Sequence, residues 1–327
     1  MLRVVHLILL TATLCARRPV LLDCDPGVDD IFALLWLCSR YDAVELVALT
    51  LIPGNSASPA QMLTNGVRAL SFFDCRDNVS VGLGKRELKE SDGFFGEDGL
   101  LGLADSLGSL PNSGLPETQE AADLIFRSIE RFGSELVLIS VGPLTNLAAT
   151  EKRYPGSLKQ VRDVLIMGGS FSQGNVEPHA EFNFWYDAQA AKDVFTGVAH
   201  AILFPLDITR TCCFDPAIKD FARKGIRGAW IAEALERATA RGIEWREPCF
   251  LPHDAYPVGF LLYPSLFKLG RITVDVDAED LVGRSFLRTG STPNAWQALS
   301  VDLSFLQKYM EDVGEYLTTI EGPHTEL

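Results

Sequence analysis

Short apolar runs alternate with amphipathic segments along the first two thirds of the chain. Six runs have the length and composition of buried strands, at 19–22, 44–52, 79–83, 135–140, 161–167 and 201–206. Helical patterns follow most of them, at 31–37, 58–73, 117–132, from 144 onward and at 188–195. Between the third strand and its helix, residues 84–116 are rich in Gly, Asp and Ser, which predicts a long loop.

This alternation predicts an α/β fold. Near-continuous apolar strands separated by helices are typical of a parallel sheet that is covered on both faces. We therefore expect a single-domain, open, mostly parallel sheet with helices on both faces. Because no linker-like break or internal repeat interrupts the pattern, residues 17–327 are expected to form one domain.

Polar residues cluster directly after the predicted strands. The stretch Asp23–Asp30 packs four carboxylates after the first strand, and Asn55 follows the second. Later strands are followed by Val141-Gly142, by residues 167–183 and by Asp207. Because the carboxyl ends of parallel strands meet at one edge of a sheet, these residues are expected to share a single pocket.

The four neighbouring carboxylates predict a cation site. Like charges this close repel one another, and a hard cation with oxygen ligands, Ca²⁺ or Mg²⁺, relieves the repulsion. Asp29 and Asp30 also suit the first turn of the following helix, where acids satisfy free N–H groups. That explanation does not cover Asp23 and Asp25, which precede the Pro26-Gly27 turn, so the cation site is favoured.

Two further polar groups are candidates for binding and catalysis. Gly174-Asn175, Glu181, Asn183 and Asp187 combine amides with carboxylates, which suits sugar hydroxyls that both donate and accept hydrogen bonds. Capping of loops is the simpler alternative for such residues. In His253-Asp254 the imidazole suits a proton donor near neutral pH, and the carboxylate suits a metal ligand.

Composition narrows the classes of partner. The chain has 327 residues, of which 47% are hydrophobic and 22% charged, as expected for a globular protein with a substantial core. Its formal net charge is −14, and no basic stripe offsets it. Nucleic-acid and anionic-membrane partners are therefore not expected.

The amino terminus predicts entry into the secretory pathway. Residues 1–16 have the basic start and apolar centre of a signal peptide, with cleavage expected after Ala16. Asn78-Val79-Ser80 is a glycosylation sequon. The ending His324-Thr-Glu-Leu327 is similar to ER-retrieval tetrapeptides, so secretion or residence in the ER lumen is expected. If residues 1–16 are instead an uncleaved extension, the alternative is a cytoplasmic protein.

The seven cysteines do not form a recognisable metal or redox motif. No C-x-x-C pair is present, which argues against a zinc or thioredoxin-type site. Cys24 and Cys38 fall in apolar strand and helix positions, so both are predicted to be thiols of the core.

Taken in order, these motifs resemble the inosine-uridine-preferring nucleoside hydrolases. The opening signature of that family, D-x-D-P-G-x-D-D, is matched by Asp23–Asp30. The resemblance extends over nearly the whole chain from Pro19, through Pro53-Gly-Asn55, Val141-Gly-Pro-Leu-Thr-Asn146, Met167-Gly-Gly169, Gly174-Asn175, Ala180-Glu-Phe-Asn183 and His253-Asp254.

The resemblance implies a Ca²⁺-dependent N-glycosidase that splits a small-molecule ribonucleoside into ribose and a free base. It assigns Ca²⁺ binding to Asp25, Asp30, Asp254 and the main-chain carbonyl of Val141. It also makes Asp25 the general base and His253 the residue that protonates the leaving base. The ribose would be bound by Asp29, Asn55, Met167, Asn175, Glu181 and Asn183. A homo-oligomer, either a dimer or a tetramer, is expected on the same ground.

The chain departs from the family pattern on the side of the base. Phe95 stands where many relatives have a histidine before Gly-Glu, and residues 243–250 lack the tyrosines that some relatives place against the base. Trp245 or Phe250 is predicted to stack on the base instead. These departures affect activation of the leaving group and choice of base, and they leave the predicted metal and ribose sites intact.

Two rival functions remain open at this point. A phosphatase with an aspartyl nucleophile also has Asp-x-Asp at a strand end, but it requires Thr or Val where this chain has Pro26, and it leaves Asp29 and Asp30 unexplained. A nucleoside- or ribose-binding protein without catalysis is the second alternative. The complete set of acids argues against it, and Phe95 is its support.

Overall fold

A computed structural model describes most of the chain from Arg17 onward. The described residues are 17–56, 58–75, 78–84, 93–110, 115, 118–214, 216–244, 249–290 and 292–321. The predicted signal peptide, the C-terminal tetrapeptide and Trp245 lie outside these residues.

Within the described residues, nine strands form one sheet in the order β4-β3-β2-β1-β5-β6-β7-β11-β8. All neighbouring pairs are parallel except β8, which runs antiparallel to β11 at one edge. The strands are β1 (Arg18–Cys24), β2 (Val44–Leu51), β3 (Ser80–Leu83), β4 (Gln119–Glu120), β5 (Val137–Ser140), β6 (Asp163–Met167), β7 (Ala201–Phe204), β8 (Phe267–Ile272) and β11 (Ala295–Val301). A separate hairpin pairs β9 (Val274–Val276) with β10 (Ser285–Leu287).

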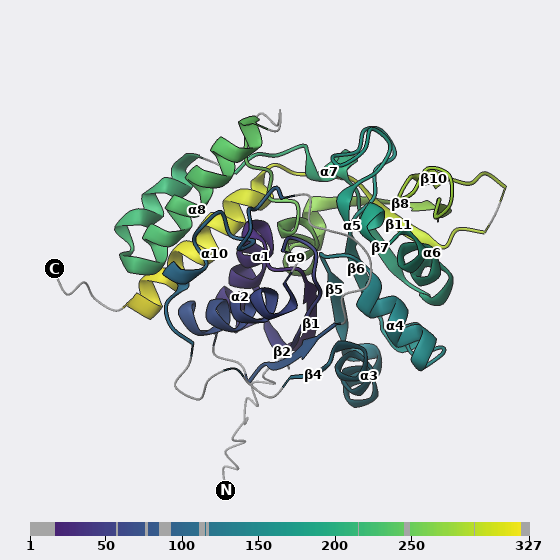
Figure 1. The fold of residues 1–327 in the computed structure, drawn as a ribbon, viewed down its shortest axis with the longest axis horizontal. Coiled ribbons are helices and arrows are strands. Elements are labelled where there is room, and N and C mark those ends of the chain that lie inside the picture. The colour runs from purple at the N-terminus through teal and green to yellow at the C-terminus, as the bar shows by residue number, and fades with distance from the viewer. Residues whose placement is uncertain are drawn as a thin grey trace, which may run out of the picture.

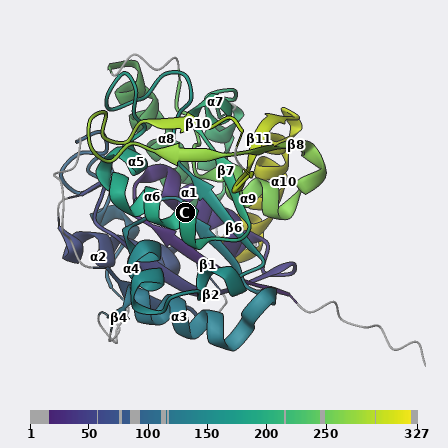
Figure 2. The same cartoon turned by 90° about the vertical axis from the view of Figure 1, so that its right-hand side faces the viewer.

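Helices cover both faces of this sheet (Figure 1). One core cluster lies beneath α1 (Val28–Ser39), α2 (Pro59–Phe72), α8 (Gly225–Glu244), α9 (Ala255–Leu262) and α10 (Ser304–Glu321). The other lies beneath α3 (Ala121–Phe132), α4 (Thr145–Arg153) and α6 (Ala188–Gly197). In the view of Figure 2, α3, α4 and α6 lie together on the near side of the strands. The predicted mostly parallel α/β architecture is therefore confirmed.

The chain path places a topological switch beside β1. From β1 the chain moves outward through β2, β3 and β4, and then returns to lay β5 on the other side of β1. Ligands of open α/β sheets bind at such a switch, outside the carboxyl ends of the strands. The helix that follows β1 is α1, all of whose residues are buried. A central, buried helix of this kind gives the loop before it a rigid support.

Some boundaries differ from those that the pattern predicts. The helix expected from residue 117 begins at Ala121, because Gln119 and Glu120 pair with β3 as a short strand. The helix α5 (Phe182–Tyr186) was missed, and so was the last third of the chain, where no element had been predicted beyond residue 206. In α5 and beyond, burial by distant segments decides the structure more than local periodicity does.

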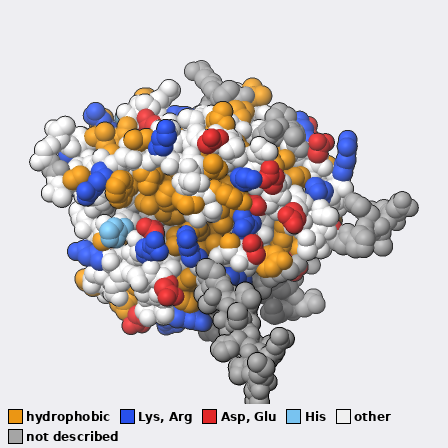
Figure 3. Space-filling model, turned by 180° about the vertical axis from the view of Figure 1, so that it is seen from behind, with side chains coloured by type: hydrophobic (Ala, Val, Ile, Leu, Met, Phe, Trp, Pro, Cys, Tyr) orange, Lys and Arg blue, Asp and Glu red, His pale blue; other side chains and the backbone are white. Residues whose placement is uncertain are grey.

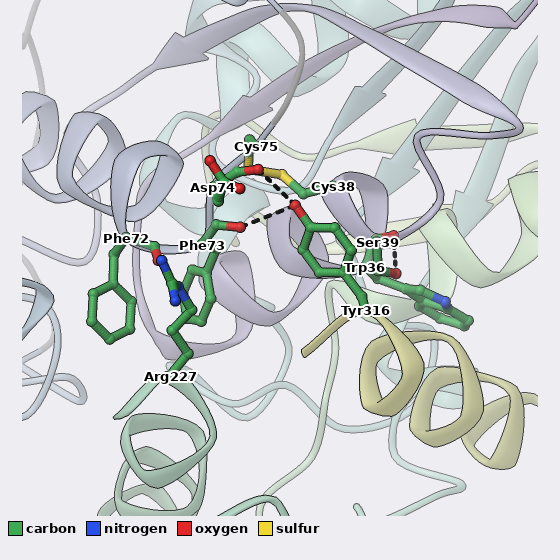
Figure 4. Close-up of a disulfide and its surroundings, with 9 residues drawn as sticks. All are labelled: Trp36, Cys38, Ser39, Phe72, Phe73, Asp74, Cys75, Arg227 and Tyr316. Atoms are coloured by element: carbon green, nitrogen blue, oxygen red, sulfur yellow. Dashed lines mark hydrogen bonds between the residues drawn. A yellow bond between two sulfur atoms is a disulfide. The ribbon is translucent and has the colours of Figure 1, made fainter. Parts of the chain in front are cut away.

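The prediction that Cys38 is a free core thiol was wrong. Cys38, near the end of α1, forms a disulfide with Cys75, and their Cα atoms lie 5.0 Å apart (Figure 4). A second disulfide joins Cys213 to Cys249, while Cys24 is a free, buried thiol as expected. Pairing depends on which segments meet in space, and a separation of 37 residues carries no signal of it.

The surface combines charged and apolar areas. Figure 3 shows hydrophobic side chains gathered in a band across the face seen from behind. On and after β11, Trp296, Leu299 and Leu303 are exposed. Across the part of the chain that the structure describes, no helix is both long enough and apolar enough to cross a membrane.

Candidate active site

The metal, ribose and catalytic residues that the family resemblance assigns all line one cavity at the carboxyl ends of the strands. Asp25 directly follows β1, Asn55 follows β2 and Val141 follows β5, while Met167 ends β6. Asp254 joins them from the residue before α9, more than 220 positions away from Asp25 in the sequence. The predicted residues in the cavity wall are Asp25, Asp29, Asp30, Asn55, Val141, Met167, Asn175, Glu181, Asn183, His253 and Asp254.

Three buried carboxylates in this cavity form a group that can hold a metal ion. One oxygen from each of Asp29, Asp30 and Asp254 lies within 4.8 Å of the other two. Burial raises the pKa of all three, and the charges of neighbouring carboxylates raise those of Asp29 and Asp254 further. A cation would offset the cost of ionising them together, and a donor set made only of oxygen suits a hard divalent ion.

Asp25 lies beside this group in a cradle made by two glycines. A Cβ atom at Gly54 would lie 2.0 Å from its Oδ2, and one at Gly142 would lie 2.7 Å from its Oδ1. The backbone N–H of Asn55 donates to the same Oδ2 over 2.9 Å. Burial, followed by the charges of Asp30 and Asp29, raises the pKa of Asp25. The Pro-Gly-Asn and Val-Gly motifs therefore leave room for this one carboxylate and hold it in place.

Asp30 caps the start of α1 and is also a member of the acidic group. Its carboxylate accepts hydrogen bonds from the N–H groups of Asp25 and Gly27, over 3.1 and 2.9 Å, and from Asn55 Nδ2 over 3.2 Å. Burial outweighs these bonds and raises its pKa to about 7. The two explanations of this acid, helix capping and cation binding, are therefore compatible.

Asp23 stands apart from the cavity. It is fully buried and accepts hydrogen bonds from Thr50 Oγ1, Asn146 Nδ2 and Ser140 Oγ, over 2.7, 2.8 and 3.1 Å. Burial raises its pKa to about 6. These bonds tie β1 to β2, β5 and α4, so Asp23 supports the strand that carries the other acids.

Asn175, Glu181 and Asn183 line the cavity and also hold its loops in place. Asn183 Nδ2 donates to the carbonyls of Val141 and Met167, over 2.7 and 3.2 Å, and Asn175 Oδ1 accepts from the N–H of Phe182. Glu181 accepts from the backbone N–H groups of Asn183 and Phe184 at the start of α5, and from that of Gly169 after β6. Burial raises its pKa to about 7 in spite of these bonds.

Two acids expected at the same pocket do not line it. Asp187 Oδ1 caps α6 by accepting from the N–H of Ala190, and Asp207 accepts from the N–H of Phe171. Asp207 follows β7 and Asp187 follows α5, and both carboxylates are used by backbone donors outside the cavity lining. The simpler capping explanation was therefore the correct one for Asp187.

His253 lines the cavity next to Asp254 in the sequence and has a buried partner. Its Nδ1 lies 2.7 Å from the hydroxyl oxygen of Thr209, at the end of α7 (Leu206–Thr209). Burial, followed by the charge of Arg210, lowers the pKa of His253 to about 3, so the ring is neutral near pH 7. Sequence reasoning missed Thr209, whose only signal was its position after a strand.

An apolar wall completes the cavity, and most of its members were not predicted. Phe95 stands where the chain departs from the family pattern. Its ring lies against Gly27, since a Cβ atom added to that glycine would lie 2.7 Å from the ring. Phe250, one of the two residues predicted to stack on the base, lines the cavity, and its ring stacks on that of Phe214. The wall residues, which we call the base-side wall, are Phe94, Phe95, Phe182, Cys249, Phe250 and Leu251.

Comparisons with known proteins indicate the family of this chain. Residues 20–308 match the sequence profile of the inosine-uridine preferring nucleoside hydrolases. The pyrimidine-specific ribonucleoside hydrolase RihB of Shigella sonnei is 27% identical over 318 residues, which is 93% of this chain and 99% of that protein. RihB of Escherichia coli K12 matches to the same extent.

Solved structures share the fold over the same length. The plant nucleoside hydrolase PpNRh1 superposes with a TM-score of 0.82 at 25% identity, covering 93% of this chain and 99% of that one. A purine-preferring ribonucleoside hydrolase from Gardnerella vaginalis gives 0.83 at 23% identity, covering 92% and 99%. With a profile that spans most of its length, the chain belongs to the inosine-uridine preferring nucleoside hydrolase family, whose members are glycosidases that hydrolyse ribonucleosides.

Proposed function

We propose that this protein is a Ca²⁺-dependent ribonucleoside hydrolase, formed by a single domain over residues 17–327, that releases ribose and a free base. The observation that carries the proposal is the division of one cavity into an acidic end and an apolar wall. A ribose suits the first, and a planar base suits the second. Family membership leaves the phosphatase alternative without support.

The acidic end fits a bound Ca²⁺. The proposed ligands are Asp25, Asp30, Asp254 and the carbonyl of Val141, all of which offer oxygen. The Val141 carbonyl accepts a hydrogen bond from Asn183, and its second lone pair stays available. When bound, the ion would lower the pKa of a water molecule and orient the vicinal ribose hydroxyls.

The carboxylates would then act on the reaction in two ways. Asp25 would accept the proton of the attacking water, which requires its ionised form. Asp29 and Asn55 would bind ribose hydroxyls, and Asn175, Glu181 and Asn183 would hold the rest of the sugar, with Met167 packed beneath it. Because breaking the N-glycosidic bond places positive charge on the ribosyl ring, the surrounding negative charge stabilises the transition state.

His253 would deliver a proton or a hydrogen bond to the departing base. A neutral ring can donate from only one nitrogen, so the partner of Nδ1 decides which nitrogen carries the proton. If the Thr209 hydroxyl donates to Nδ1, the proton resides on Nε2. This arrangement supports the predicted role of His253 and makes Thr209 part of it.

The relatives include a pyrimidine-specific and a purine-preferring enzyme, so the assay covers both classes of base. A panel of inosine, guanosine, adenosine, uridine and cytidine, with CaCl₂ or with a chelator, tests the proposal by chromatography of the free base. We expect release with Ca²⁺ and loss of release with chelator. Binding of a nucleoside without any release would favour the binding-protein alternative, and release that survives chelation would exclude the Ca²⁺ mechanism.

We further propose that the protein folds in the secretory pathway. Two disulfides support this location, because such bonds are rare in cytosolic proteins. The sequon residue Asn78 is exposed. After expression of the full chain in a secretory host, glycosidase digestion should increase gel mobility, and Asn78→Gln should abolish that change. Mobility insensitive to glycosidase, together with free thiols at all cysteines, would contradict the location.

The predicted homo-oligomer can be tested by sedimentation of the same material.

A further inference from the structure

The two disulfides have nearly equal spans but different surroundings. Cys38–Cys75 closes 37 positions and Cys213–Cys249 closes 36. The first ties the end of α1 to the segment after α2, near Tyr316, which donates to the carbonyls of Phe73 and Asp74 (Figure 4). Neither of its cysteines lines the cavity, whereas Cys249 does.

The Cys213–Cys249 bridge fastens two segments that also pair through their neighbours. The N–H of Phe214 donates to the carbonyl of Phe250 over 3.3 Å, and the two rings stack with centroids 6.0 Å apart. Both rings also meet Phe32 of α1 edge-on, at 5.3 and 5.8 Å. The bridge therefore fixes the register of a small aromatic cluster against the buried helix.

The chain segment that carries Phe250 of this cluster also supplies residues that line the cavity. Cys249, Phe250 and Leu251 belong to the base-side wall, and His253 and Asp254 follow them. The N–H of His253 donates to the carbonyl of Leu251 over 2.9 Å, which couples the turn before α9 to this wall. The bridge thus holds the amino end of the segment that supplies the wall, the imidazole and a proposed cation ligand.

We propose that the Cys213–Cys249 disulfide is a positioning element of the nucleoside site, which holds the base-side wall in its binding geometry. The inference rests on the proposed function and concerns the base end of the same cavity. Without the bridge, binding must order the segment 249–251 at an entropic cost, and this cost weakens binding of the nucleoside. Asp25 and Asp30 keep their own backbone donors from Asn55 and Gly27, and His253 keeps its contact with Thr209, so the chemical step should change less than binding.

The same bridge is the more accessible of the two. Cys249 and Cys75 are both half-buried, but Cys213 is exposed whereas Cys38 is buried. Dithiothreitol should therefore reduce Cys213–Cys249 first, since access governs thiol–disulfide exchange. In this step the S–S bond breaks and two thiols form, while dithiothreitol loses two electrons and two protons and closes to its cyclic disulfide.

A pair of double variants tests the proposal, with inosine and uridine as probes and saturating Ca²⁺. We expect Cys213→Ser/Cys249→Ser to raise KM about tenfold, which corresponds to 1.4 kcal/mol, while kcat changes less. Hydrogen exchange of residues 249–254 should become faster. The matched variant Cys38→Ser/Cys75→Ser should lose a similar amount of thermal stability, because its loop is of similar length, but its KM should not change.

Equal KM values in the wild type and in Cys213→Ser/Cys249→Ser would overturn the proposal, as would an equal rise in KM in both double variants. If the first variant does not fold, the wild type is titrated with dithiothreitol and compared with Cys38→Ser/Cys75→Ser, in which only the bridge at the wall remains to be reduced. KM should rise together with the appearance of thiols at Cys213 and Cys249, and a constant KM overturns the proposal. Failure of the wild type to release any base would count against the proposed function instead.

Discussion

The acidic end of the cavity and its base-side wall differ in the origin of their residues. Most of the acidic end comes from turns that directly follow β1, β2, β5 and β6, and each turn carries a recognisable motif. The wall comes from the turn segment at 94–95, from Phe182 and from 249–251, which lie far apart in the sequence, and its Phe250 packs on Phe32 of α1.

The two ends also differ in what holds them. Backbone N–H groups and glycine cradles hold Asp25 and Asp30 at hydrogen-bond distance. Aromatic contacts and a disulfide hold Phe250. A rigid scaffold for the reaction and a more variable wall for selectivity are a common division of labour in enzymes, because loops tolerate change while strand ends do not. This difference predicts that mutations at the acidic end lower turnover, whereas mutations in the wall change selectivity.

The largest effect is expected from Asp25→Asn, which removes the proposed base without changing the volume of the side chain. Turnover should fall on the order of 10²–10⁴-fold, measured as release of free base at saturating nucleoside. The control is Asp23→Asn, the same exchange two residues earlier in a residue outside the cavity, whose amide can face Ser140. If Asp25→Asn keeps most of the turnover, or if both variants lose it equally, the assignment of the base is wrong.

A smaller effect is expected at the partner of His253. Thr209→Val removes one hydroxyl, and with it one hydrogen bond, so kcat should fall about tenfold with little change in KM. Thr209→Ser should restore the rate. A riboside with 4-nitrophenolate as leaving group, which departs without protonation, should be cleaved by both variants at the wild-type rate. An equal loss on that substrate would show that Thr209 supports the fold rather than the proton on His253.

Selectivity should respond to Phe95, the family departure. Phe95→His introduces a donor into the apolar wall, and the ratio of kcat/KM between inosine and uridine should shift by roughly tenfold or less. Phe95→Leu keeps the wall apolar and should leave this ratio nearly unchanged. The Ca²⁺ concentration that gives half-maximal activity should be the same in all three proteins. A change in Ca²⁺ dependence without a change in selectivity would contradict the proposal that the wall sets selectivity and the acidic end binds the cation.

The smallest effect is expected on stability as a function of pH. Burial raises the pKa values of Glu181 and Asp30 in the folded protein to about 7, above their ordinary values of 4.5 and 3.8. The folded state therefore retains their two protons where the unfolded state has lost them, which outweighs the one proton that neutral His253 lacks in the folded state, so stability falls as pH rises from about 5 to 7. The melting temperature of chelated protein should fall by a few degrees over this range.

Glu181→Gln tests the same linkage because it removes one of the titrating groups. The slope of melting temperature against pH should become smaller in this variant. Added Ca²⁺ should stabilise the wild type more at pH 8 than at pH 5.5, because cation ligands must be deprotonated. A chelated wild type whose stability rises over this pH range would contradict the raised pKa values.

The sequence was most informative where chain neighbours are also spatial neighbours. Asp25, Asp29 and Asp30 follow an apolar strand and precede an apolar helix, so their placement at the strand end could be predicted and was found. It was less informative in the last third of the chain, where α8, α9 and α10 pack around α1 and no element had been predicted. The long-range contacts of that region decide its structure, and local hydrophobic periodicity does not predict them.

By itself the sequence determined most of the strands and helices up to residue 206, and the acids, amides and glycines at the strand ends, because these depend on local pattern and turn chemistry. Only the tertiary structure decided which distant residues meet. It brought Asp254 to Asp29 and Asp30, paired Thr209 with His253, and joined Cys213 to Cys249. It also drew Asp187 and Asp207 away to backbone donors. Such partners are selected by the packing of whole segments, and that packing is not encoded at any single position.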